Sequence, residues 1–239
     1  MLGRFLEISL HAPDIIRSLG FYEELGFTQA PVGEIWQHPY AVVTDGRLFI
    51  GLHDHEFQSP ALTFVQPDLE HRVTALERAG HELVFKRVGG EVFNEAGLLD
   101  PAGQMIALLE ARTFSPPERR SHETSKLGWF EQVVLPVKDL DASVAFWESL
   151  GFVPAEENEQ PFPHIGLTSD SLNVALMRSR GLGQAGLMFR DAGMPERIRQ
   201  LAEAGIGFSA ELPAGLDPDR YALLIAPEGT PLLLATGDE

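Results

Sequence analysis

The sequence predicts an α+β protein built from four copies of one strand–helix–strand–strand–strand unit. Three observations lead to this prediction: four segments share a helical apolar pattern, each ends at a glycine, and these glycines are regularly spaced. Gly26 and Gly80 are 54 residues apart, as are Gly151 and Gly205, and the first and third glycines are 125 apart. Fixed periods of this length indicate internal repeats. The chain is therefore predicted to be a duplication of a duplication, with units grouped two and two.

The four helices each combine an apolar stripe with end signals. In the second helix, Leu69, Val73 and Leu76 have the i, i+4, i+7 spacing of a helix that buries one face. An aspartate stands at the N-cap position of the first three helices. The repeated glycine stands where a left-handed residue ends a helix. The expected helices are Asp14–Leu25, Asp68–Ala79, Asp139–Leu150 and Gly193–Ala204.

Turn signals divide the rest of each unit into strands. Asp45 and Gly46 form a hairpin signal between Tyr40–Thr44 and Leu48–His53. Gly89 and Gly90 separate two more strand-like runs, Leu83–Val88 and Glu91–Leu98. The turns at 100–103 and 226–229 lead into two final apolar strands, Gln104–Ala111 and Thr230–Ala235.

The longer repeat is visible in the residues and sets the domain limits. Residues 14–27 read DIIRSLGFYEELGF, and residues 139–152 read DLDASVAFWESLGF. Between the two halves lies a polar segment with two adjacent prolines and no periodicity, which is typical of a linker. We therefore expect an N-terminal domain at 1–112, a linker at 113–127 and a C-terminal domain at 128–239.

Composition excludes some partners and favours a cytoplasmic location. The 239 residues are 44% hydrophobic and 22% charged, and the formal charge is −17. Such a charge repels nucleic acid and anionic membrane surfaces, so neither is an expected partner. No apolar stretch approaches the roughly 20 residues of a membrane span, and the N-terminus has no signal-peptide pattern. The absence of cysteine agrees with an expected cytoplasmic protein.

The paired units and their motifs resemble the vicinal oxygen chelate superfamily. The resemblance rests on FYEELGF at 21–27, FWESLGF at 146–152 and the Asp-Pro-x-Gly turn at 100–103, and it covers nearly the whole chain outside the linker. This superfamily includes glyoxalase, the bleomycin-resistance proteins and the extradiol dioxygenases. The resemblance implies two domains, each a curved mixed sheet around an open cup that binds ligand. It does not select a function, because lyases, isomerases, oxygenases and binding proteins share this fold.

The resemblance also implies where a metal would bind. Metal enzymes of the superfamily take ligands from the first and last strands of each unit, and such N/O donors suit divalent transition metals. In the N-terminal copy these places hold Glu7, Gly51, Ala61 and Ala107. In the C-terminal copy they hold Gln132, Ala175, Gly186 and Leu233. Each copy offers one donor where a catalytic site needs about three, so we predict no cofactor.

A relocated divalent metal is an alternative. Strand alternation places Glu7, Ser9 and His11 on one face, with Leu6, Ile8 and Leu10 toward the helices. If Glu7 points into the cup, His11 and His53 could complete a metal set with it. The competing interpretation places His53 in a solvated turn and His11 at a strand end.

The leading hypothesis is a metal-free tandem protein that binds a small, partly aromatic organic molecule in the N-terminal cup. Small side chains at the metal places would leave room for a ligand, and the loop at 34–40 adds aromatic residues at the mouth. These rings either stack on a ligand or pack against the partner domain. The expected ligand-binding set is Glu7, Ser9, Trp36, His38, Tyr40, Phe49, Gly51, His53, Thr63, Met105 and Ala107.

The alternative function is a lyase, isomerase or dioxygenase of the same superfamily. It would use Glu7 as a general base, or the relocated metal of Glu7, His11 and His53. The structural alternative for Glu7 is a carboxylate that hydrogen-bonds a neighbouring strand. The C-terminal cup is expected to be the poorer binding site. Its expected inward residues are Gln132, Val134, Asn173, Ala175, Met177, Met188, Arg190 and Leu233. Arg190 would either meet an acidic ligand or form a salt bridge at the rim. That copy would act as a built-in dimer partner in a monomer, and a homodimer is the other possibility.

Overall fold

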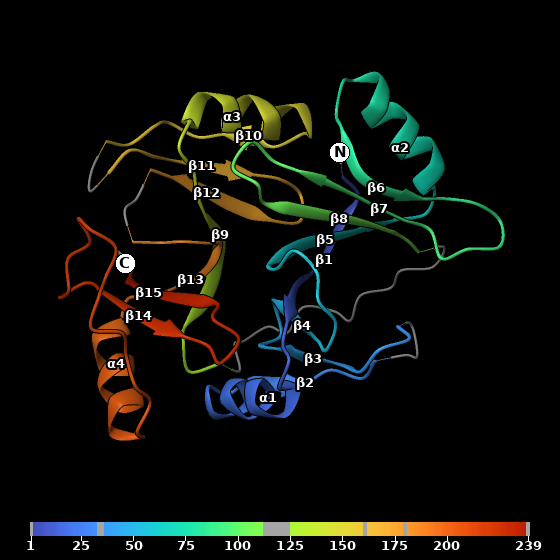
Figure 1. The fold of residues 1–239 in the computed structure, drawn as a ribbon. Helices are drawn as coiled ribbons and strands as arrows, with labels where there is room; N and C mark the ends of the chain where they lie inside the picture. The colour runs from blue at the N-terminus through green and yellow to red at the C-terminus, as the bar shows by residue number, and fades with distance from the viewer. Residues whose placement is uncertain (1, 33–35, 112–124, 160–161, 179–180, 238–239) are drawn as a thin grey trace.

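The computed structural model describes residues 2–32, 36–111, 125–159, 162–178 and 181–237. Within these residues the chain forms two mixed β-sheets, of eight and seven strands, with four helices on their outer sides (Figure 1). In each sheet the two outermost strands do not pair with each other, so neither sheet closes into a barrel. The predicted α+β class is confirmed.

The N-terminal sheet joins the first two units side by side. Its order is β2-β3-β4-β1-β5-β8-β7-β6. The central strands β1 and β5 pair antiparallel, and each pairs in parallel with the last strand of its own unit. The two units of this half therefore pair with each other. The strands are β1 (Arg4–His11), β2 (Thr28–Gln29), β3 (Tyr40–Thr44), β4 (Phe49–His53), β5 (Ala61–Gln66), β6 (Leu83–Arg87), β7 (Glu95–Leu99) and β8 (Met105–Glu110).

The C-terminal sheet repeats this topology with one strand fewer. Its order is β10-β11-β12-β9-β13-β15-β14, again with two antiparallel central strands, β9 and β13. Both β12 and β15 run parallel to the first strand of their unit. The strands are β9 (Trp129–Pro136), β10 (Val153–Pro154), β11 (His164–Thr168), β12 (Asn173–Met177), β13 (Gly186–Asp191), β14 (Tyr221–Ile225) and β15 (Pro231–Thr236).

The helices begin and end at the residues that the sequence predicts. They are α1 (Ile15–Glu24), α2 (Leu69–Arg78), α3 (Leu140–Ser149) and α4 (Met194–Glu203). In the first three, the N-cap aspartate accepts a hydrogen bond from the backbone three residues later, at 3.0 to 3.1 Å. The glycine after each C-cap has a φ between 88° and 97°, a conformation that costs side-chain-bearing residues energy. Across the described ranges, none of the helices is long and apolar enough to cross a membrane.

The fourth unit departs from the predicted pattern. It has two strands after its helix, β14 and β15, where three were expected. The segment between α4 and β14 contains Gly207, Pro213, Gly215 and Pro218 and forms no strand. Prolines lack the N–H that a ladder requires, and glycines weaken strands, so this segment loops across the sheet edge. In the second unit, β7 begins at Glu95, four residues later than predicted.

Most of the expected linker, residues 113–124, lies outside the described residues. Of the last three linker residues, Ser125 and Leu127 are buried, and the backbone N–H of Lys126 donates to the carbonyl of Leu25 at 2.7 Å. The chain is therefore already packed against α1 before β9 begins.

Strand alternation separates each sheet into an apolar face and a second face. In β1, Ile8 and Leu10 are fully buried and belong to one core cluster that also contains residues of both halves and of the helices. Burial of each such side chain contributes about 1.5 to 3 kcal/mol. Glu7 and Ser9 point the other way, as predicted. A register shift between Phe5 and Glu7 places Phe5 against the core in place of Leu6, for which the sequence predicted that position. We call this second face of the two sheets the N-terminal cup and the C-terminal cup.

The two halves are joined by hydrogen bonds from equivalent aromatic residues. Tyr22 of α1 and Trp147 of α3 are 125 residues apart, and both are fully buried. The hydroxyl of Tyr22 donates to Glu228 Oε1 at 2.7 Å, and the indole N–H of Trp147 donates to Asp100 Oδ2 at 3.2 Å. Each carboxylate lies in the turn before the last strand of the other half. Burial, chiefly, raises the pKa of Tyr22 well above its usual value, so its phenol remains a donor.

We predict that Tyr22→Phe lowers the free energy of unfolding by about 1 to 2 kcal/mol, because a half-buried carboxylate loses one of its donors. Urea denaturation measures this loss. Tyr221→Phe is the matched control, since the Tyr221 hydroxyl has no hydrogen bond within the described residues, and it should change stability by less than about 0.5 kcal/mol. Equal stabilities of the Tyr22 variant and the wild type would contradict this role for the inter-half bond.

Candidate functional site

Strand registers show which positions of the two cups are equivalent. Ser9 lies opposite Gly51 on β4 and opposite Ala61 on β5. In the other half, Val134 lies opposite Ala175 and Gly186 in the same way. Two residues further along β5 and β13, Thr63 lies opposite Ala107, and Met188 lies opposite Leu233. The alignment that the helix glycines suggest is therefore confirmed by the pairing of the strands.

A buried carboxylate lies at the centre of the N-terminal cup. Glu7 is 7% exposed, and its Oε1 accepts a hydrogen bond from Ser9 Oγ at 2.8 Å. Ser9 Oγ is also 2.7 Å from Thr63 Oγ1. Because the single hydroxyl hydrogen of Ser9 is used on Glu7, Thr63 must be the donor to Ser9. Thr63, Ser9 and Glu7 thus form one chain of donors that ends at Oε1.

A second chain of donors reaches the same oxygen through two histidines. His53 is buried at the end of β4, and its Nε2 lies 3.2 Å from Glu7 Oε1. Its Nδ1 lies 3.0 Å from His38 Nε2. An ionised carboxylate only accepts hydrogen bonds, so His53 must carry a hydrogen on Nε2. A neutral His53 then has its lone pair on Nδ1 and accepts from His38.

Gly51 allows this arrangement and is itself covered by it. A Cβ atom at this position would lie 2.6 Å from Glu7 Cδ and 2.8 Å from His53 Nε2. These separations are shorter than van der Waals contact, so any side chain would displace the pair. From the sequence, the small residue at this position was expected to leave room for a ligand. The structure instead fills the space beside Gly51 with the carboxylate and the imidazole.

Aromatic rings surround His53. Tyr40, at the start of β3, stacks on its ring with centroids 5.6 Å apart and planes at 8°. Trp36 meets it edge-on at 5.6 Å, and Phe57 does so at 5.8 Å. Phe93, from the connection between β6 and β7, lies 5.4 Å from Trp36. Trp36 and Tyr40, which the sequence predicts, and Phe57, which it does not, therefore contact the imidazole of His53, and Phe93 packs behind Trp36.

The cup continues from Glu7 toward the sheet edge along one row of paired residues. Thr63 lies opposite both Glu7 and Ala107, Ala107 lies opposite Gly97, and Gly97 lies opposite Phe85. The ring of Phe85 covers Gly97, where a Cβ would be 2.7 Å from its Cζ, yet Phe85 remains 40% exposed. Phe85 was not among the predicted ligand-binding residues, although strand alternation with a correct hairpin register would have placed it in the cup.

The other predicted residues lie on the same face with different roles. Phe49 is half-buried at the start of β4, and Met105 is buried opposite Ala61. His11 does not join the Glu7 cluster: it pairs with His53 along the strands, but its ring lies against Phe57 at 6.5 Å. Within the described residues no hydrogen bond joins His11 to Glu7 or His53.

The environment keeps His38 in its neutral form. Burial, the main cause, lowers its pKa, and the neighbouring rings of His53 and His55 lower it further. His55 stacks on His38 with centroids 5.0 Å apart. Asp54 acts in the opposite direction. A neutral His38 donates to His53 when its single ring hydrogen is on Nε2.

The C-terminal cup contains apolar side chains at the equivalent positions. Val134 replaces Ser9, Met188 replaces Thr63 and Met177 replaces His53. These three belong to a separate buried cluster with Phe162, Ala175, Leu182, Leu233 and Ala235. Gln132, at the Glu7 position, donates to the sulfur of Met188 at 3.3 Å. Buried apolar side chains therefore occupy this cup, and Arg190, one of its expected inward residues, forms a salt bridge with Glu131 at 2.6 Å.

The residues at the metal positions of this fold do not fit a divalent cation. In the N-terminal cup Glu7 is the single donor of its set, and its Oε1 is already occupied by Ser9 and His53. In the C-terminal cup, Ala175 and Leu233 lie in the apolar cluster. Among the residues that the structure describes, no three His, Cys, Asp or Glu side chains are grouped to hold a metal. The relocated set of Glu7, His11 and His53 is not assembled, because His11 lies apart.

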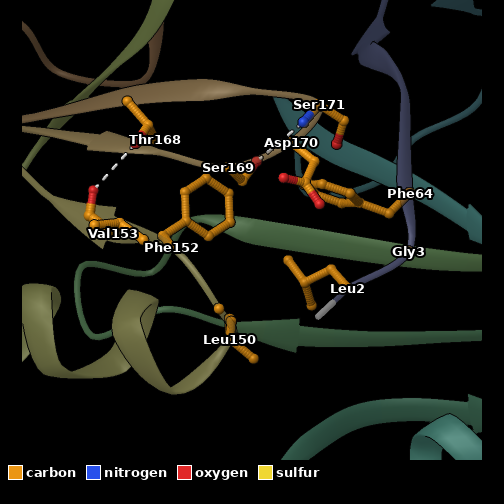
Figure 2. Close-up of a pocket in the computed structure, with 11 residues that line it drawn as sticks. Leu2, Gly3, Phe64, Leu150, Phe152, Val153, Thr168, Ser169, Asp170 and Ser171 are labelled. Atoms are coloured by element: carbon orange, nitrogen blue, oxygen red, sulfur yellow. Dashed lines mark hydrogen bonds between the residues drawn. The ribbon is translucent and has the colours of Figure 1, made fainter.

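A cavity of about 230 Å³ lies elsewhere, between the two halves (Figure 2). Leu2 and Phe64 line it from one half and Phe152 from the other, and it shares no residue with the Glu7 cluster. Its charged residue, Asp170, is exposed. We place the candidate site at the Glu7 cluster, because that is where buried polar groups and aromatic rings converge.

Comparisons with known proteins show the fold. No protein-family model and no curated protein sequence matches the chain. Solved structures do match. A catechol 2,3-dioxygenase has a TM-score of 0.64 at 12% identity, with 100% of this chain and 89% of that chain covered. The E323L mutant of homoprotocatechuate 2,3-dioxygenase from Brevibacterium fuscum has a TM-score of 0.66 at 15% identity, with 99% and 72% covered.

A third match is 2,2',3-trihydroxybiphenyl 1,2-dioxygenase from Sphingomonas wittichii strain RW1. Its TM-score is 0.63 at 17% identity, with 99% of this chain and 91% of that chain covered. At such identities the likeness shows the fold alone. That fold is the two-domain vicinal oxygen chelate fold, as the sequence predicts.

We predict that Gly51→Ala separates Glu7 from His53 and lowers the free energy of unfolding by about 1 to 3 kcal/mol, because overpacking forces the buried pair apart. Chemical denaturation measures the loss, and NMR of the His53 ring reports the broken contact. Gly166→Ala is the control, because a Cβ there has its nearest neighbour at 4.0 Å. An unperturbed His53 signal in the Gly51 variant would show that the contact does not depend on glycine.

We predict that the wild type loses stability on acidification through the histidine range partly because of His38. The pKa of His38 is lower in the folded than in the unfolded chain, so the unfolded state binds more protons between the two values. Stability therefore falls as the pH decreases from about 7 to about 5. His38→Gln should flatten this slope in thermal melts taken across that range. An unchanged slope would mean that His38 titrates normally.

Proposed function

We propose that the chain is a metal-independent binding protein that holds a small, partly aromatic organic molecule in its N-terminal cup. One observation supports this proposal most directly: four equivalent positions are polar and hydrogen-bonded in the N-terminal cup, whereas three of the four are apolar in the C-terminal cup, where Gln132 is the exception. The N-terminal positions are Glu7, Ser9, Thr63 and His53, and the C-terminal ones are Gln132, Val134, Met188 and Met177.

The energetic comparison favours a functional role for the polar set. Burying a carboxylate and an imidazole costs free energy that hydrogen bonds only partly return, whereas apolar residues at the same places pack without this cost. The C-terminal cup demonstrates that the fold accommodates the apolar solution. The polar side chains of the N-terminal cup are therefore better explained by an interaction with a ligand than by a contribution to folding.

The surrounding rings support an aromatic ligand. Trp36 and Tyr40 are half-buried, and Phe85 and Phe93 are 40% and 39% exposed. Partly exposed rings on a cup face offer flat surfaces on which a planar molecule stacks. The net charge of −17 disfavours polyanions and is compatible with neutral or cationic molecules. Sequestering a toxic compound would require no more than such binding.

The C-terminal copy then serves as a scaffold. Its cup is filled, and its turn residue Glu228 holds α1 of the first copy through Tyr22 and Ser18. In this proposal a single chain provides the pairing of domains, and the ligand is held by the N-terminal copy.

We predict that indole, quinoline or 4-nitrophenol stabilises the protein by about 2 to 4 °C at a concentration about tenfold above its dissociation constant. The same compound should quench tryptophan fluorescence through Trp36. Trp36→Phe should remove most of the quenching and weaken binding several-fold. Trp129→Phe, which removes a 38% exposed ring of the other half, should leave both unchanged. If none of these compounds shifts the melting temperature, or if quenching survives in the Trp36 variant, the proposed site is wrong.

A further inference from the structure

We propose that the N-terminal cup is a metal-independent proton-transfer site in which Glu7 is the general base and Ser9 and His53 are positioning residues. This inference rests on the proposed function, because the base acts on a molecule bound in the same cup. Its substrate class is a flat, partly aromatic compound that carries an acidic C–H bond.

Two chains of hydrogen-bond donors converge on one oxygen of the Glu7 carboxylate. Thr63 and Ser9 reach Glu7 Oε1 from one side, and His38 and His53 reach it from the other. Within the described residues no group donates a hydrogen bond to Oε2. Oε1 is thus held in place by two donors, and Oε2 is left as the oxygen with lone pairs available to a ligand.

The two histidines orient the Glu7 carboxylate and do not themselves act as the base. The Nε2 atom of His53 carries the hydrogen that is donated to Glu7, and its Nδ1 accepts from His38 in the neutral state. Neither nitrogen of His53 then has a lone pair free for a substrate. Tyr40 stacks on the ring of His53, and Trp36 packs edge-on against it. These contacts hold the His53 side chain where it donates its hydrogen bond to Glu7.

The second copy has the same strand pairing around its central strands and lacks the base. Gln132 occupies the Glu7 position but cannot accept a proton at neutral pH, and Met177 and Met188 cannot donate as His53 and Thr63 do. The geometry of the sheet therefore does not require a carboxylate at this place. A positioned carboxylate beside apolar and aromatic surface is the arrangement that general-base catalysis uses.

The probe for this activity is 5-nitrobenzisoxazole, a flat aromatic compound whose ring opens when its ring C–H proton is removed. The proton passes to Glu7 Oε2, and the C–H electron pair becomes the third bond of a nitrile. The N–O bond breaks, and its electron pair remains on oxygen as a coloured nitrophenolate. Glu7 then releases its proton to water. The reaction needs no metal, oxidant or second substrate.

The full chain should open the probe about 100-fold faster than Glu7→Gln does, which is a typical gain from one positioned base. EDTA should leave the rate unchanged. Glu131→Gln is the matched control: it removes a carboxylate from the first strand of the other half, where Glu131 pairs with Arg190, and should keep the wild-type rate. His53→Phe should reduce kcat about tenfold with little change in KM and should alter the pH profile, as expected of a positioning residue.

Two readouts separate this inference from the proposed function. Quenching of Trp36 reports whether the probe binds, and nitrophenolate release reports proton transfer. Binding with equal rates in wild type and Glu7→Gln would overturn the proton-transfer site and leave the binding function standing. Absence of binding would overturn both. Should Glu7→Gln fail to fold, Glu7→Asp keeps the charge but withdraws the carboxylate by one methylene, and a rate within twofold of wild type in that variant would also overturn the inference.

Discussion

The N-terminal cup depends on one buried carboxylate whose Oε1 accepts hydrogen bonds from Ser9 and His53. A buried charge without partners would cost several kcal/mol, and the chain meets this cost with one donor from β1 itself and one from the neighbouring β4. These hydrogen bonds require a glycine at position 51, since a side chain there would occupy the space of the carboxylate and the imidazole. The aromatic rings around His53 follow from the same contact, because they pack on an imidazole that Glu7 holds.

Duplication within the chain provides an internal comparison that few folds offer. Both copies share strand order and register around their central strands, so differences between the cups on these strands come from their side chains. One copy fills its cup with Met177, Met188 and Leu233, and the other retains a hydrogen-bonded cluster. The relation to the extradiol dioxygenases is one of fold, and the site chemistry has to be argued from these residues.

The contact between the halves follows the same duplication but is not a strict copy. Tyr22 and Trp147 are equivalent, yet one donates to the third residue of a turn and the other to the first. Ser18 adds a second donor to Glu228. Tyr22 and Trp147 thus each donate a hydrogen bond to a carboxylate in a turn of the other half, but the local geometry differs. This contact ties α1 and α3 to the opposite sheets, and buried residues of both halves belong to one core cluster.

The sequence by itself determined the elements whose signals are local. The four helices with their aspartate caps and closing glycines, the 54- and 125-residue periods and the two faces of β1 follow from backbone preferences and side-chain periodicity. These signals lie within a few residues of one another, and so they could be read without a structure. The metal-deficient positions could also be predicted, because the repeat fixes their alignment.

Only the tertiary structure decided what fills the cup. Gly51 suggested open space in the sequence, but the pairing of β1 with β4 brings Glu7 and His53 over it. Phe93 meets Trp36 although 57 residues separate them, and the fourth unit lost a strand that its period implied. Contacts of this kind depend on strand register and on loops closing over a sheet, which are set by the packing of the whole domain and leave no local pattern in the chain.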